Sequence, residues 1–308
     1  MTPTLLGVAV LLVALPRVAW RLGRRLHPRE WVILGVAAVF VGAAALELGL
    51  ILLALPTVLR GVGVPDLAAA CRRLLGDLAP GGTRVGWTAA LLSVAVPVLF
   101  VRGHSNARAA LATMTVEPDV GVHVIEGGIE FVLLDTAGVV AYSVDGDTRQ
   151  VVTSQGLLHS LSVEEHQAVL RHEVAHLRCR HQRLLLLLTA IEAAVPSARL
   201  TTPVLRTGIE RWADEESAGR VVPARRTLCD ALLHVAGVAE DEPAVAAFAS
   251  VQTTLERVRG LIAGPPAPRP VERVAVHTAM LATSLLGVAA LAGWLVEAQM
   301  MLAAVRLC

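Results

Sequence analysis

Aromatic and charged side chains are both scarce in this sequence. Aromatic residues make up 3% of the 308 positions and charged residues 17%, whereas 55% of the positions are hydrophobic. The mean hydropathy of +0.62 is therefore carried mainly by Leu, Val and Ala. This composition argues against an ordinary soluble globule, and it suits helices in lipid better than the core of a β-sandwich.

The chain also lacks an excess of charge and a cysteine pattern. The formal net charge is +1, which gives no electrostatic reason to expect binding of nucleic acid or of an acidic polymer. The four cysteines are widely scattered and form no C-x-x-C pair. Neither a disulfide framework nor a cysteine zinc site is indicated, and we expect the cysteines to be small buried hydrophobic residues.

Four apolar stretches approach the length of about 20 residues that a transmembrane helix needs. They cover residues 5–20, which Pro16 and Arg17 shorten, then 31–59, which contains Glu47, and finally 86–101 and 274–301. No positive charge precedes the first stretch, so we expect a retained span rather than a cleaved signal. Residues 17–30 carry five arginines against one acid, which places them in the cytoplasm by the positive-inside rule. Counting spans from there predicts that residues 102–273 are cytoplasmic.

The segment between the third and fourth apolar stretches has a different residue pattern. Short β-branched runs at 120–125, 131–134, 139–143 and 150–153 predict a small sheet or two hairpins. Helical patterns follow at 163–188, 204–220, 225–236 and 243–262. We therefore predict a mainly α-helical membrane protein with a membrane region at 1–101, an α+β domain at 102–263, a Pro-rich linker at 264–273 and a last span within 274–308.

The strongest chemical signal is H-E-V-A-H at residues 172–176. Ser162 and Glu165 precede it with the spacing of a capping box, so a helix begins where the motif needs one. Residues four apart share one face of a helix, so His172 and His176 can present two imidazoles to one metal ion. Glu173 lies about 100° around the helix, where it can act as a general base without being a ligand.

A third ligand distinguishes a metal site from two histidines on a solvated helix face, which would show the same spacing. Glu210, on another predicted helix, would complete a site of two histidines and one carboxylate with a fourth position open. Asp214, one turn further on, is placed to orient a ligand histidine through its free ring nitrogen. The alternative is that both acids pair with surface arginines.

Other residues near the motif receive weaker assignments. His181 lies five residues after His176, so we expect it to point off the ligand face as a surface or interface histidine. Cys179 lies about 10 Å along the helix axis from His172, too far to bind the same ion. Three arginines follow Glu210 and are candidates for stabilising an oxyanion, but nothing selects among Arg220, Arg225 and Arg226.

Several stretches together resemble the core of membrane gluzincin-like peptidases. VVTSQGLL at 151–158, LS at 161–162 and AVLRHEVAH at 168–176 are similar to two related groups. One group contains the CAAX prenyl proteases and heat-shock membrane proteases, and the other is the β-lactam-sensor metallopeptidase family. LRCRHQRL at 177–184 and VAYSVDG at 140–146 are closer to the second, although Gln182 stands where that family often has an acid.

The resemblance implies one zinc ion per chain and a zincin-like peptidase domain between membrane spans. It also implies that Glu210 is the third ligand, and that the strand containing Ala141, Tyr142 and Ser143 binds substrate as an added β-strand. The sensor proteins carry a C-terminal extracellular penicillin-binding domain that this sequence does not match. Direct sensing of β-lactams is therefore not expected.

These observations predict a multi-pass zinc endopeptidase of the cell membrane. Its partners would be membrane lipid and a cytoplasmic or membrane-proximal protein or peptide substrate, for example a repressor or a membrane protein in quality control. Binding of nucleic acid is not expected, and no oligomeric state is indicated. The first alternative is a non-enzymatic membrane scaffold or signalling protein that retains the peptidase fold. The second, CAAX-type processing of prenylated peptides, predicts more than four spans.

Overall fold

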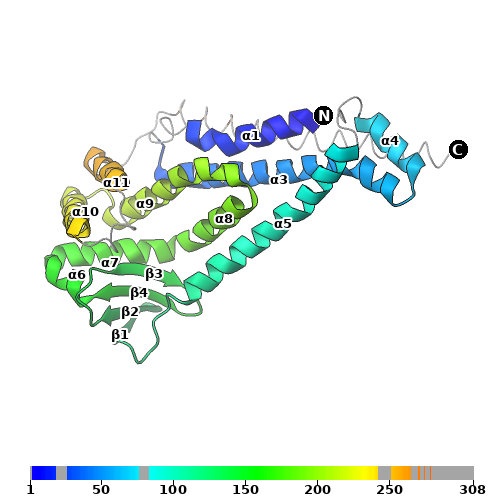
Figure 1. The fold of residues 1–308 in the computed structure, drawn as a ribbon. Coiled ribbons are helices and arrows are strands. Elements are labelled where there is room, and N and C mark those ends of the chain that lie inside the picture. Colours follow the sequence, from blue (N-terminus) through cyan, green and yellow to red (C-terminus); the bar gives the residue numbers. More distant parts are fainter. Residues whose placement is uncertain are drawn as a thin grey trace.

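The computed structural model describes residues 2–18, 26–75, 83–241 and 251–264, and the single positions 270, 274 and 278. Long helices dominate one end of the molecule, and a small sheet lies beyond the far end of α5 (Figure 1). The described elements are, in chain order, α1 (Thr2–Val18), α3 (Pro28–Gly61), α4 (Pro65–Leu75), α5 (Thr83–Ala112), β1 (Val122–Glu126), β2 (Ile129–Leu134), β3 (Ala141–Asp145), β4 (Arg149–Ser154), α6 (Gln155–Ser160), α7 (Val163–Arg178), α8 (His181–Ala194), the 3₁₀ helix η2 (Pro196–Leu200), α9 (Thr202–Ala218), α10 (Val222–Asp241) and α11 (Val251–Ala263).

Within the described residues, α3 and α5 are long and apolar enough to cross a membrane. Their most apolar windows have mean hydropathies of 2.4 and 1.8. Only 11% of the α5 window is buried, so this helix turns much of its apolar surface outward. The expected span at 5–20 is a helix of 17 residues, α1, and the expected span at 274–301 lies almost wholly outside the described residues. Two of the four predicted spans are thus supported by length and composition.

The four predicted β stretches form strands, and the described strands make one sheet in the order β1-β2-β4-β3. The pairs β1–β2 and β3–β4 are antiparallel, while β2 and β4 are parallel. This parallel pair joins what would otherwise be two separate hairpins. The β1–β2 turn contains Gly127 and Gly128 at φ values of 58° and 77°, which residues with a Cβ rarely adopt.

The helix that carries the histidine motif begins as predicted and ends earlier than predicted. Ser162 caps α7, since its Oγ accepts from the backbone N–H of Glu165 at 3.3 Å, and the Glu165 carboxylate accepts from the backbone N–H of Ser162 at 2.8 Å. The single helix expected over 163–188 is wrong. Arg180 adopts φ 55° and ψ 38°, and this left-handed residue divides the segment into α7 and α8.

One hydrophobic core links the N-terminal helices to the helices around the motif. Gly208 of α9 lies so close to α3 that an added Cβ would be 2.8 Å from a methyl of Val32, and Gly103 brings α5 similarly close to Ala193 of α8. Helix α5 also runs past the predicted domain boundary at 101. Helices α8 and α9, which lie beside the motif helix, are therefore anchored on α3 by a shared cluster that includes Trp31, Val32, Val36, Leu188, Ile191, Leu205, Ile209 and Trp212.

A buried ion pair fastens α10 to α9. The Arg225 guanidinium donates to both carboxylate oxygens of Glu215, at 2.7 and 2.8 Å, and also to the backbone oxygens of Gly219, Gly260 and Leu261. Both side chains are about 95% buried. Because its donors are engaged in joining α9, α10 and α11, Arg225 acts as a structural residue rather than as the oxyanion-stabilising arginine considered from the sequence.

Candidate metal centre

Two histidines of α7 and one glutamate of α9 converge on a single point. The Nε2 atoms of His172 and His176 lie 3.1 Å apart. The Glu210 carboxylate oxygens lie 3.4 Å from Nε2 of His172 and 3.7 Å from Nε2 of His176. One ligand atom from each residue falls within 4.8 Å of the others. The fold thus brings together the three side chains that the sequence predicted as ligands.

This donor set fits a divalent metal ion such as zinc. Two imidazoles and one carboxylate are a common zinc set that leaves a fourth position for water or substrate. The second ring nitrogen of each histidine also has a polar partner. Nδ1 of His172 lies 3.0 Å from Oδ1 of Asp214, and Nδ1 of His176 lies 3.1 Å from Nδ1 of His181. Such support fixes the tautomer and the ring orientation of metal-binding histidines.

The two ligand histidines differ in their affinity for a proton, because burial together with His172 and Arg257 lowers the pKa of His176, whereas the pKa of His172 is raised. Burial lowers the pKa of His172 and so does Arg257, but the carboxylates of Asp214 and Glu210 outweigh them and raise it to about 9. Burial likewise opposes ionisation of Glu210, yet His176, His172 and Arg257 hold the pKa of this carboxyl well below its usual range. The carboxylates that attract a proton to His172 will also attract a divalent cation, which displaces that proton when it binds.

Arg257 of α11 joins the site, although the sequence did not single it out. Its Nε and Nη2 donate to the two oxygens of Asp214 at 3.0 and 2.8 Å, and its Nη1 lies 3.3 Å from Oε2 of Glu210. A bidentate pair of this kind is stronger and more directional than a single contact. The two acids therefore do pair with an arginine, as the alternative expected, but this arginine is 13% exposed and belongs to the site.

Glu173, which the sequence suggests as a general base, faces strand β3. The Oγ of Ser143 donates to Oε2 of Glu173 at 2.9 Å. Ala141 shares the strand face of Ser143, whereas Tyr142 turns to the other face, where its Oη donates to the backbone oxygen of Met114 at 3.1 Å. β3 stands last in the sheet order, so no other described strand pairs with its outer edge. Of the three residues predicted to bind substrate, Ser143 is the one bonded to Glu173.

Replacement of Ser143 by Ala tests whether this hydrogen bond matters for activity. A hydrogen bond to a charged group contributes about 1.5–3 kcal/mol, so kcat/KM for peptide cleavage should fall about 10-fold or more. Ser160→Ala is the matched control, because its Oγ donates only to the Leu157 carbonyl. Equal kcat/KM for wild type and both variants would show that Ser143 does not support Glu173.

His181 lies against the site rather than on the surface, so the expectation for it is wrong. Its side chain is fully buried, and its ring packs edge-on against Trp212 with centroids 4.5 Å apart. The expectation assumed one continuous helix, in which a residue five positions after His176 points away from the ligands. The helix break at Arg180 instead turns His181 back toward His176.

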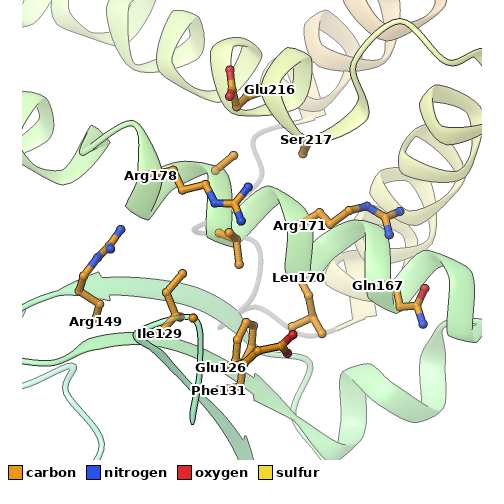
Figure 2. A pocket seen from close by; sticks show the side chains of 13 residues that line it. Glu126, Ile129, Phe131, Arg149, Gln167, Leu170, Arg171, Arg178, Glu216 and Ser217 are labelled. Atoms are coloured by element: carbon orange, nitrogen blue, oxygen red, sulfur yellow. The ribbon is translucent and has the colours of Figure 1, made fainter. Parts of the chain in front are cut away.

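The large cavity of Figure 2 does not contain the metal centre. It has a volume of about 710 Å³ and is lined by the β1–β2 hairpin, Arg149, α7 and the end of α9. Arg171, Val174 and Arg178 line it from α7, and at about 100° per residue they lie about 100–160° around that helix from His172. The cavity therefore lies on a different face of α7 from the converging ligands.

Comparison with known proteins finds one similarity, to a peptidase family. Residues 127–249 match the family model described as Peptidase family M48. The matched segment holds the H-E-V-A-H motif, Glu210 and Asp214 but ends before Arg257, and it covers less than half of the chain. No curated protein and no solved structure matches the chain. Residues 127–249 are thus similar to peptidase family M48, a family of metal-dependent hydrolases, and the match does not distinguish between the two groups that the sequence resembles.

Proposed function

We propose that the chain is an integral-membrane, zinc-dependent endopeptidase that hydrolyses peptide bonds of a cytoplasmic or membrane-proximal protein. The observation that supports this most is the convergence of His172, His176 and Glu210, next to Glu173, inside a segment that matches peptidase family M48. A regulatory protein is the substrate class that the resemblance to the β-lactam-sensor family implies.

His172, His176 and Glu210 would hold the zinc ion. When bound, zinc supplies a Lewis acid that makes a water molecule acidic near neutral pH and polarises the scissile carbonyl. Glu173 takes the proton from the attacking water and then gives it to the leaving amine, so that each turnover returns the carboxylate to its starting state. Ser143 donates a hydrogen bond to Oε2 of Glu173, and this leaves the other carboxylate oxygen to exchange the proton.

The membrane location rests on α3 and α5. Both have the length and apolarity of a span, and the outward-facing apolar surface of α5 needs a lipid or protein neighbour. Helices α8 and α9 pack on the same core as α3, which would keep the metal centre next to the membrane surface. The arginines between residues 17 and 29 favour a cytoplasmic peptidase domain.

The alternative, a scaffold that retains the peptidase fold without activity, is disfavoured by the complete set of groups. A scaffold needs neither a general base nor three converging ligands, whereas in this chain three candidate ligands converge and Glu173 is hydrogen-bonded to Ser143. CAAX-type processing predicts a chamber formed by many spans, whereas the described residues contain two helices that qualify.

Reversible metal dependence tests the proposed function. Full-length protein purified in detergent should cleave an unfolded protein such as casein and generate new N-termini that labelling and mass spectrometry can map. Treatment with 1,10-phenanthroline should reduce cleavage to background, and one equivalent of zinc should restore it, because the ligands bind the ion reversibly. Cleavage that resists the chelator would refute a metallopeptidase, and zinc-loaded protein without cleavage would favour the scaffold.

A further inference from the structure

His181 occupies its buried position because of an unusual backbone turn. Arg180, just before it, has the left-handed conformation that residues with a Cβ adopt at an energetic cost. The turn starts α8 at His181 and directs the imidazole against the back of His176, with the two Nδ1 atoms 3.1 Å apart. A continuous helix would have carried this side chain away from the site.

The contact between the two rings determines where their protons lie. Two ring nitrogens at this distance form a hydrogen bond only when one carries a proton and the other accepts it. The Nε2 atom of His176 faces His172 and Glu210, so it is the atom that must be free of a proton to bind a metal ion. Nδ1 of His176 therefore donates, Nδ1 of His181 accepts, and the proton of neutral His181 lies on Nε2.

Stability alone does not account for a histidine here. The Nε2 atom of His181 is buried without a hydrogen-bond partner in the described part of the chain, and the ring packs against Trp212. An apolar side chain of similar size would avoid leaving that polar atom unpaired. Residues that break a local packing rule in this way tend to occur at functional sites.

We propose that His181 is a positioning residue: its neutral imidazole accepts the Nδ1 proton of His176 and thereby presents Nε2 of His176 to the zinc ion. The inference rests on the proposed function in that zinc is the ion bound. Asp214 does for His172 what His181 does for His176, so one ligand is supported by a carboxylate and the other by an imidazole. This second support is expected to matter for metal affinity as much as the first.

Two substitutions separate the hydrogen bond from packing. His181→Leu fills the space but removes the acceptor, and we expect the zinc dissociation constant, measured by competition with a chelator, to rise about 10- to 100-fold. His181→Asn places an amide oxygen close to the position of Nδ1, so it should keep most of the affinity. In ¹⁵N-histidine-labelled, zinc-loaded wild type, the His176 signal should report a proton on Nδ1.

The outcomes also separate this inference from the proposed function. A folded His181→Leu protein with wild-type zinc affinity, or a His176 without a proton on Nδ1, would overturn the positioning role. An Asn variant no better than the Leu variant would do the same. Wild type that binds no zinc would overturn both proposals, whereas zinc binding without proteolysis would overturn the proposed function and leave the role of His181 intact.

Discussion

Replacement of Glu173 by Gln is expected to abolish proteolysis while leaving zinc bound. The amide cannot take a proton from the attacking water, and general base catalysis contributes about 10²- to 10⁴-fold to a rate of this kind. Glu173 is absent from the converging ligand set, so its loss removes no donor from the ion. The measurement is kcat/KM for peptide cleavage, together with zinc content by atomic emission on the same preparation.

Glu164→Gln provides the matched control for this variant. It makes the same chemical change in the first turn of the same helix, where the side chain is exposed. We expect its zinc content and its cleavage rate to equal those of wild type within twofold or so, because exposed substitutions change stability little. If the Glu173→Gln protein cleaves at the wild-type rate, Glu173 is not the base and the proposed mechanism is wrong.

Replacement of Glu210 by Ala is expected to weaken metal binding strongly. Structural zinc sites bind with about 10–16 kcal/mol from four ligands, so one ligand contributes about 3 kcal/mol, or about 10²-fold in affinity. The substitution also leaves Arg257 and His172 with one carboxylate fewer near them, which raises the repulsion felt by a cation. Zinc affinity should therefore fall by at least that factor, and cleavage should be lost at limiting zinc.

Glu216→Ala serves as the control on the same helix. Glu216 is exposed and lies at the cavity of Figure 2 rather than at the ligands, so zinc affinity should not change. A Glu210→Ala protein that is folded by circular dichroism and retains wild-type zinc affinity would exclude Glu210 as a ligand. In that case the two histidines would need a different third partner.

The sequence predicted those parts of the site that depend on local geometry. A capping box fixes where α7 begins, and the four-residue spacing then places His172 and His176 on one face whatever the rest of the fold. Glu210 and Asp214 follow the same helical rule on α9, so finding one acid predicts the position of the other. The β-strands can be predicted from the sequence because strand patterns and glycine turns are local features as well.

The other features of the site and of the fold depend on tertiary contacts, which the sequence alone does not reveal. Arg257 lies 43 residues beyond Asp214, and nothing in its neighbourhood distinguishes it from other arginines until α11 packs beside α9. The prediction for His181 is wrong because it depends on unbroken helical periodicity, which Arg180 interrupts with a positive φ that residues with a Cβ seldom adopt. The parallel pairing of β2 with β4 could not be deduced either, since it joins strands that are not consecutive in the sequence.

The zinc content of purified full-length protein tests the central claim most directly. Wild type should hold about one zinc per chain after removal of loosely bound metal, and the Glu210→Ala variant prepared in parallel should hold almost none. A wild-type protein that folds, remains soluble in detergent and binds no zinc when the ion is supplied would contradict the metal centre. The mechanism proposed for Glu173 would then have no basis.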